Sequence, residues 1–179
     1  MTLPHATRRE DTPEHTAPEA LDPQRFRDAL ARFPSGVTVV TTRDQHGQPY
    51  GLTASAFTSV SLDPPLVSFC LAHSAACHPV FAGSDAFTVN VLAVQDTDLA
   101  LRFARQGEDK FADKRMHGTR EGAPTVADAL AVLDCSVYAR HPAGDHTILL
   151  GEVQQAQVRD GDPLVLWGKT FQRVTELAS

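Results

Sequence analysis

The sequence predicts a mainly β protein, a barrel with helical additions, folded as one domain. Short β-branched and aromatic runs alternate with turn-rich segments along most of the chain. Only two segments have clear helical periodicity, and strands do not alternate regularly with helices, which argues against a parallel sheet. With 179 residues, of which 42% are hydrophobic, the chain is long enough for one well-buried domain and short for two.

The N-terminal region predicts a tail followed by a short helix. Residues 1–20 are rich in proline and charge and poor in large apolar side chains, so we expect a disordered tail before a domain at residues 21–179. Asp22 and Pro23 are typical of a helix start, and Pro34 would end the helix. Its apolar face would consist of Phe26, Ala29, Leu30 and Phe33.

A strand at residues 37–42 is predicted by its β-branched side chains, with a turn at 44–47. From Gly51 to Leu71 hydroxyl and apolar side chains alternate, which predicts one polar face and one core face. The polar face would carry Thr53, Ser55, Ser59 and Ser61 with Phe57. The core face would carry Leu52, Ala54, Ala56, Val60 and Leu62 with Thr58. Such a polar face suits a flat cofactor with a phosphate, and a solvated barrel strand is the alternative.

The second half predicts further strands and one more helix. Phe69 and Leu71 would close a strand that starts after Pro65, and residues 86–92 alternate as another strand. Asp96 or Thr97 would cap a helix that carries Leu99 and Phe103. A long loop anchored by Phe111 is predicted at 106–128. Strands at 130–139 and 147–158 would follow, with a turn at 141–146 between them. The final strands would lie at 164–167 and 171–174.

Composition argues against several partners. The net charge is -6 and the basic residues are scattered, so we expect no nucleic-acid partner and no attraction to anionic membranes. No segment has the roughly 18 apolar residues of a membrane span, and the N-terminus lacks a signal-peptide core. The three cysteines have no CxxC spacing, which fits a reducing compartment, and we expect a cytoplasmic protein.

Common catalytic motifs are absent or weak. No glycine pattern matches a dinucleotide-binding fingerprint or a phosphate-binding loop, so a nucleotide would bind on a barrel surface. Cys70, His73, Cys77 and His78 have a poor spacing for zinc, and we expect no metal. A hydrolase built on these cysteines and histidines remains an alternative, although no local motif selects a nucleophile. His146 and Asn90 are each either a structural residue or a ligand contact.

Six segments, in order, resemble the flavin reductase-like family, whose members are FMN-binding split barrels and reductase components of two-component flavin monooxygenases. They are FPSGVTVVTT, GLTASAFTSVSLDPPLVSFCL, FTVNVL, a helix ending in RFA with Lys110-Phe111 downstream, GDHTILLGEV and PLVLWGKTF. The resemblance spans about Phe26 to Val174. It implies a split β-barrel of Greek-key type that forms a homodimer and reduces FMN or FAD with NADH or NADPH.

The resemblance also implies site residues. Flavin would contact Gly51, Leu52, Thr53, Ala54, Ser55 and Ala56. Its phosphate would meet the loop after the PPLVSFCL strand, where this chain has HSAACHP and where Cys70, His73, Ser74 and Cys77 are candidates, with Ser59 as a further donor. Ala104 and Arg105 match another flavin-contacting turn, and Asn90 is a further candidate. His146 in the GDH segment would orient the nicotinamide, with Phe171 stacking nearby.

Three hypotheses follow for the function. The first is an NAD(P)H:flavin oxidoreductase that supplies reduced flavin by diffusion to a partner monooxygenase. The second is a flavin-binding barrel without turnover, which would act as a sensor or carrier. The third is the thiol or zinc hydrolase. The sequence leaves open FMN against FAD, NADH against NADPH, and the identity of the partner oxygenase.

Overall fold

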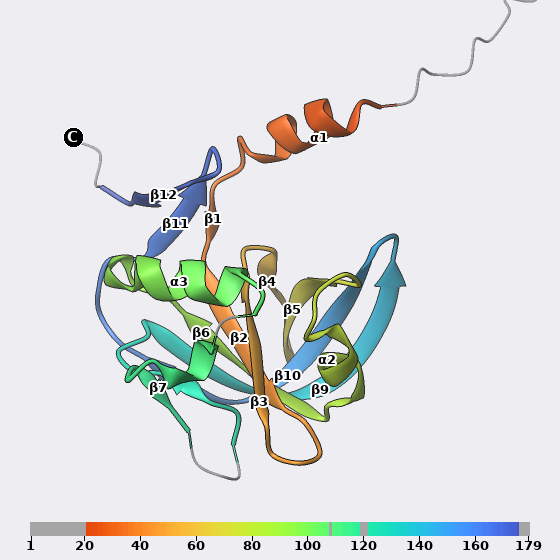
Figure 1. Cartoon of the computed structure of the whole chain (residues 1–179), viewed down its shortest axis with the longest axis vertical. Helices are drawn as coiled ribbons and strands as arrows, with labels where there is room; N and C mark the ends of the chain where they lie inside the picture. Colours follow the sequence, from red (N-terminus) through yellow and green to blue (C-terminus); the bar gives the residue numbers. More distant parts are fainter. Residues whose placement is uncertain (1–20, 108, 119–121, 176–179) are drawn as a thin grey trace, which may run out of the picture.

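The computed structural model describes residues 21–107, 109–118 and 122–175, and shows a curled sheet with short helices around it (Figure 1). Strand pairing is antiparallel throughout this part of the chain. The mainly β fold with helical additions is therefore confirmed. The tail predicted for residues 1–20 lies outside the described residues.

The first helix begins where the sequence predicts it, as α1 (Pro23–Leu30). The Asp22 carboxylate accepts a hydrogen bond from the Gln24 N–H at 3.0 Å, which satisfies one unpaired donor of the helix start. The apolar face is not buried, because α1 projects from the body of the molecule (Figure 1). Phe26, Leu30 and the following Phe33 are 50%, 58% and 76% exposed.

The large sheet of the described chain contains seven strands in the order β3-β2-β6-β9-β10-β5-β4, so β3 and β4 are its edges. These strands are β2 (Thr38–Arg43), β3 (Pro49–Ala54), β4 (Phe57–Leu62), β5 (Pro65–Ala72), β6 (Ala86–Val91), β9 (Ala131–Ala143) and β10 (His146–Val158). The strand at 37–42, the strand after Pro65 and the strand at 86–92 are thus confirmed within a residue or two.

Smaller elements complete the fold. A second sheet has the order β1-β11-β12 and a third pairs β7 with β8. These strands are β1 (Ser35–Gly36), β7 (Met116–His117), β8 (Thr125–Val126), β11 (Leu164–Trp167) and β12 (Thr170–Arg173). The helices are α2 (His78–Gly83), α3 (Thr97–Ala104) and the 3-10 turns η1 (Val94–Asp96) and η2 (Lys110–Ala112).

The continuous two-faced strand predicted after Gly51 is wrong. The chain turns at Ser55 and Ala56, and β3 and β4 then lie at opposite edges of the sheet. Ala54 is buried as predicted, but Leu62, predicted for the core face, is 94% exposed. The alternation continues through the turn, whereas the strand does not, so periodicity alone could not locate the break.

Two predicted loops are shorter than expected. The turn at residues 141–146 is reduced to Gly144 and Asp145, since β9 and β10 continue to its edges. Gly144 has φ 61°, a conformation that glycine adopts readily in tight hairpins. The loop at 106–128 contains η2, β7 and β8. Phe111 is confirmed as its anchor, because it packs against a buried cluster.

The core lies on both faces of β2. Val40 joins a cluster inside the curled sheet that includes Phe69 and Phe87, whose ring centroids are 5.2 Å apart. Val39 joins a second cluster that includes Phe103 of α3. A strand buried on both faces explains the uninterrupted run of β-branched residues. Packing of α3 against β2 and β3 places the end of this helix beside an edge strand.

Candidate functional site

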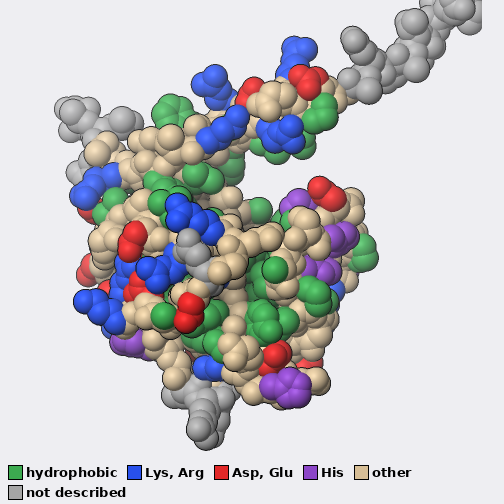
Figure 2. Space-filling model, in the orientation of Figure 1, with side chains coloured by type: hydrophobic (Ala, Val, Ile, Leu, Met, Phe, Trp, Pro, Cys, Tyr) green, Lys and Arg blue, Asp and Glu red, His purple; other side chains and the backbone are tan. Residues whose placement is uncertain are grey.

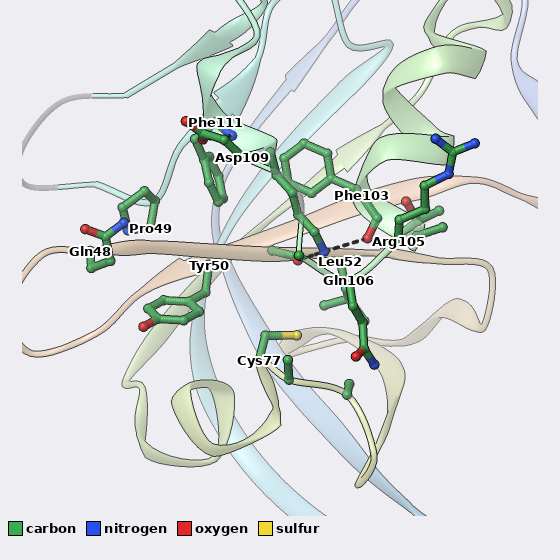
Figure 3. Close-up of a pocket in the computed structure, with 17 residues that line it drawn as sticks. Gln48, Pro49, Tyr50, Leu52, Cys77, Phe103, Arg105, Gln106, Asp109 and Phe111 are labelled. Atoms are coloured by element: carbon green, nitrogen blue, oxygen red, sulfur yellow. Dashed lines mark hydrogen bonds between the residues drawn. The ribbon is translucent and has the colours of Figure 1, made fainter.

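A cavity of about 470 Å³ opens between three segments of the chain (Figure 3). One wall is β3 with the residue before it, the second is the loop before α2, and the third runs from the end of α3 to η2. The lining residues described are Gln48, Pro49, Tyr50, Gly51, Leu52, Thr53, Ala75, Ala76, Cys77, Phe103, Ala104, Arg105, Gln106, Gly107, Asp109, Lys110 and Phe111. Its size is within the range of small-molecule and cofactor sites.

Gly51 allows an aromatic ring to approach the backbone of β3. A Cβ placed on Gly51 would lie 2.7 Å from Cε1 of Phe103 and 3.0 Å from the carbonyl oxygen of Val40. The ring of Phe103 in turn meets Phe111 edge to face, with centroids 5.3 Å apart. This part of the cavity wall is therefore apolar and aromatic, which suits the apolar faces of a ring system.

Hydrogen bonds fix β3 to the third wall. The Thr53 hydroxyl donates to the carbonyl of Ala100 at 2.6 Å. The ammonium group of Lys110 donates to the carbonyl of Phe103 at 2.9 Å and to that of Gly51 at 3.2 Å. These contacts join the edge strand β3 to the end of α3 and to η2. They therefore fix the positions of the first and third walls relative to each other.

The polar groups of the cavity have distinct surroundings. Arg105 is exposed, and its guanidinium points away from Cys77 (Figure 3). The Asp109 carboxylate accepts hydrogen bonds from the N–H groups of Phe111 and Ala112 and so caps η2. Burial raises the pKa of the Cys77 thiol, which keeps it protonated and a poor nucleophile at neutral pH.

A second cluster of polar side chains, which contains three histidines, lies at the β9–β10 hairpin. The rings of His73 and His78 are edge to face with centroids 4.9 Å apart, and Nε2 of each lies 3.1 Å from the Thr147 hydroxyl. Nδ1 of His146 lies 2.7 Å from the Asp145 carboxylate, and this hydrogen bond lowers the pKa of Asp145. Figure 2 shows histidines gathered on this side of the molecule. His73 is two residues from the cavity wall at Ala75.

The structure brings part of the predicted set together. Among the residues predicted to bind a cofactor, the ones lining the cavity are Gly51, Leu52, Thr53, Cys77, Ala104 and Arg105. Ala54 continues β3 into the core, Ser55 and Ala56 form the turn after it, and Cys70 is half-buried on β5. His73 and Ser74 are exposed in the loop that leads to the second wall, and His146 begins β10 beside them.

Three more of the predicted residues lie on strands that form none of the cavity walls. Ser59 is exposed on β4, at the other edge of the sheet from β3. Phe171 lies on β12 and packs against the buried cluster beneath α3. Asn90 is fully buried in β6, where its amide group donates to Val39 O at 3.0 Å and its carbonyl accepts from Val126 N at 2.8 Å.

Sequence reasoning missed the aromatic and cationic part of the wall. Phe103 was predicted only as a residue of the helix, and Lys110-Phe111 only marked the family pattern. A signal was present, because two aromatic residues and a lysine close to a helix end are unusual for a solvated loop. The loop at Ala75 and Ala76 belongs to the HSAACHP segment, which the resemblance implied as the phosphate loop, whereas Gln48 at the start of the first wall had no comparable signal.

The described side chains and helices offer neither a metal site nor a membrane span. Within residues 21–107, 109–118 and 122–175, no three histidine, cysteine or acidic side chains lie close enough together to hold a metal ion. The described helices include none that is long and apolar enough to cross a bilayer.

The family match and the most similar relatives agree on the family of this chain. Residues 30–175 match the family described as flavin reductase like domain. The actinorhodin polyketide dimerase of Streptomyces coelicolor is 49% identical over 153 residues, which are 85% of this chain and 86% of that protein. The FMN reductase (NADH) SmoA of Agrobacterium fabrum is 45% identical over 148 residues, 83% of this chain and 84% of that protein.

Two more relatives extend this comparison. The reductase component of the 4-nitrophenol 4-monooxygenase/4-nitrocatechol 2-monooxygenase of Rhodococcus opacus is 40% identical, over 90% of this chain and 86% of that protein. Among solved structures, the NADH:FAD oxidoreductase SgcE6 of Streptomyces globisporus C-1027, in complex with NAD and FAD fragments, superposes with a TM-score of 0.81. It is 37% identical, and the match covers 90% of this chain and 99% of that one.

Proposed function

Because the chain belongs to the flavin reductase-like family, we propose that its cavity between β3, the Ala75–Cys77 loop and the α3–η2 segment is the flavin site of an NADH-dependent flavin reductase. The observation that carries this assignment is the convergence of separate family segments. Gly51 to Thr53, Cys77 and Ala104-Arg105 are far apart in sequence and line one cavity of about 470 Å³. The function itself, reduction of FMN or FAD by NADH, is that of the named reductase relatives.

The residues present fit a flavin. The aromatic rings of Phe103 and Phe111 beside the backbone of Gly51 offer an apolar wall for a ring system. Backbone and hydroxyl groups of β3 can bind the polar edge of such a ring, and Arg105 at the rim can neutralise a phosphate. His73 and Ser74, exposed beside the loop at Ala75, are proposed as further phosphate contacts.

The chemistry belongs to the two cofactors. When bound, the flavin accepts a hydride from NADH, so that NAD⁺ leaves with one hydride fewer and the flavin gains two electrons and one proton. The chain's own residues along β3 and at the end of α3 would hold the flavin, and the cavity opening would admit the nicotinamide nucleotide. Because the hydride passes directly from one cofactor to the other, the reaction requires no general acid or base in the protein.

His146 is proposed to orient the nicotinamide nucleotide. Its ring is held by Asp145 at 2.7 Å, at the start of β10 and next to the loop that leads to the second wall. A held imidazole presents its other nitrogen in a fixed direction, which suits an amide or phosphate partner. NADPH is the alternative donor in this proposal.

We also propose a partner, an oligomeric state and a location for this protein. A monooxygenase component would receive the reduced flavin by diffusion, which is supported by the relative named as a reductase component and by a cavity that opens to solvent. A homodimer is supported by the exposed apolar side chains of α1 and β4. A cytoplasmic location is supported by the free thiols of Cys70, Cys77 and Cys135.

A turnover assay tests the proposed reaction. Purified protein is mixed with NADH and either FMN or FAD, and the loss of reduced-nicotinamide absorbance is followed against a protein-free blank. We expect turnover far above the blank. Absence of turnover with both flavins and both nicotinamide nucleotides, with flavin still bound, would instead favour a carrier or sensor.

The role of His146 is tested by His146→Ala. We expect a higher KM for NADH, by about tenfold for one lost directed hydrogen bond, with the Kd of FMN changed less than twofold. His46→Ala is the matched control, because His46 is an exposed histidine in the turn between β2 and β3. Unchanged kinetics in His146→Ala would show that this residue only shapes the hairpin.

A further inference from the structure

Lys110 links two walls of the cavity through its ammonium group. It begins η2 and reaches back to the carbonyls of Phe103, at 2.9 Å, and Gly51, at 3.2 Å. Its Nζ lies 5.8 Å from the centroid of the Phe103 ring. Two carbonyl oxygens and an aromatic face all favour a cation at this point, so the charge is held in one place.

The surroundings make this charge effective in the cavity. Lys110 is half-buried, whereas Arg105, the other cation of the lining, is exposed and screened by solvent. The Asp109 carboxylate on the same segment is engaged with backbone N–H groups of η2. Across the cavity, the charge of Lys110 opposes the effect of burial on the pKa of Cys77. A fixed, partly desolvated charge acts more strongly on a ligand than a mobile one in water.

Hydride transfer to flavin creates a charge that such a group can stabilise. The hydride brings two electrons and one proton, so the reduced ring is an anion until it takes up a second proton from solvent. A nearby fixed cation favours the anion over the protonated form and lowers the pKa of the reduced ring. By linkage, it also favours binding of reduced over oxidised flavin.

We propose that Lys110 is the residue that holds reduced flavin in its anionic form, through an ammonium group fixed between β3 and the end of α3. This proposal rests on the assignment of the cavity as the flavin site. It adds to that assignment a residue that stabilises the reduced, deprotonated form of the ligand.

The experiment measures bound reduced FMN without turnover. FMN is reduced with dithionite under anaerobic conditions, bound to the full-length protein, and titrated with acid while its near-ultraviolet spectrum is followed. We expect the pKa of reduced FMN to be lower when bound to the wild-type protein than in buffer. Lys110→Met should raise this pKa by about one unit and reduce the preference for reduced over oxidised FMN about tenfold.

Two variants separate charge from structure. Lys110→Arg keeps the charge and should keep the lowered pKa, even if FMN binds more weakly. Lys114→Met removes a charge at an exposed position four residues away and should leave both measurements unchanged.

Several outcomes would overturn the proposal. An equal loss of affinity for oxidised and reduced FMN in Lys110→Met would show that Lys110 only holds the cavity together. If the wild-type protein does not lower the pKa of reduced FMN, or does not bind it, the proposal fails without reference to any variant. Since dithionite replaces NADH, these results are independent of the turnover assay, and loss of turnover alone would contradict only the reductase function.

Discussion

At the residue scale, Gly51 has the most demanding position in the cavity wall. Any side chain there would meet the Phe103 ring on one side and the backbone of Val40 on the other. We expect Gly51→Ala to lower the free energy of unfolding by about 1–3 kcal/mol, the usual cost of overpacking. The shifted Phe103 ring should also weaken FMN binding at least tenfold, which urea unfolding and fluorescence titration would measure.

The matched control is Gly36→Ala. Gly36 lies in β1, and a Cβ placed there meets nothing within 4 Å. We therefore expect little change in stability or FMN binding. If both variants bind FMN like the wild-type protein, close approach of Phe103 to β3 is not required for the site.

Asn90 is a second residue whose role can be separated by mutation. Its side chain joins β2 to β8 inside the core, through Val39 and Val126. Asn90→Leu leaves the Val126 N–H buried without a partner, and we expect a loss of about 1–3 kcal/mol in the free energy of unfolding. The Kd of FMN should change less than twofold, because Asn90 lies outside the cavity lining. A large change in the Kd of FMN with an unchanged free energy of unfolding would show that Asn90 contacts the cofactor and is not only a structural residue.

At the element scale, Arg115 fastens the segment after η2 to the first turn of α3. It contacts both carboxylate oxygens of Asp98, at 3.0 and 2.7 Å, and both of Asp113, at 3.0 and 2.8 Å. These hydrogen bonds lower the pKa of both carboxyls. Asp96 lies 3.4 Å from the same guanidinium, and burial raises its pKa. Its ionised form therefore lowers the stability of the fold at neutral pH, which opposes the stabilisation from Asp98 and Asp113.

The sign of the pH dependence follows from these directions. A carboxyl whose pKa is lower in the folded state stabilises the fold above its unfolded pKa of about 4, and the stabilisation is lost as the pH falls through the folded value. We expect Arg115→Met to lower the free energy of unfolding by about 1–2 kcal/mol at pH 7, since Asp98 is exposed and screened. The variant and wild-type stabilities should approach each other in urea unfolding as the pH falls below about 4.

Arg159→Met is the control for this network. Arg159 pairs with Asp128, and both side chains are exposed. Such a pair contributes little, so the loss should stay within about 0.5 kcal/mol at every pH. A constant difference between Arg115→Met and the wild type from pH 7 to pH 2 would mean that Arg115 acts by packing and not by its charge.

Elements were predictable where local chemistry decides them. Asp22-Pro23 located the start of α1, and the β-branched run located β2. The break at Ser55-Ala56 was not predictable, since the alternation of polar and apolar side chains passes through it unchanged. The exposure of Leu62 likewise depends on β4 becoming an edge strand, which is a property of the whole sheet.

The site was predictable in part for a related reason. The family segments gave Gly51 to Thr53 and Ala104-Arg105, which the fold brings to one cavity. Lys110 and Phe103 were missed as site residues, because their contacts join η2 and α3 to β3 across a large separation in sequence. The aromatic residues and the lysine near the helix end were a local signal for a buried or bound site, but the local sequence does not show that their partner is β3.

At the scale of the whole molecule, apolar side chains are exposed on two elements that have little covering within the chain. These are α1 and the edge strand β4, where Val60 and Leu62 are exposed. The end of α1 is nevertheless held, because Gly168 N–H donates to Ala31 O at 3.0 Å and the Trp167 ring N–H donates to Arg32 O at 3.2 Å. A fixed helix with an unburied apolar face is typical of an interface between protein chains.

Dimerisation through α1 gives the last prediction. We expect the wild-type chain to be a dimer by light scattering after size exclusion, and Phe26→Ser/Leu30→Ser to be monomeric, because each change removes apolar area whose burial contributes about 1.5–3 kcal/mol. Arg25→Ser/Arg27→Ser is the matched control, since it introduces the same two serines into α1 outside the apolar face and should remain dimeric. A wild-type monomer at micromolar concentration, or a dimer that survives Phe26→Ser/Leu30→Ser, would show that this face is not the interface. If the apolar variant is monomeric and still binds FMN like the wild type, each chain carries a complete flavin site, whereas a parallel loss of binding would place part of that site on the partner subunit.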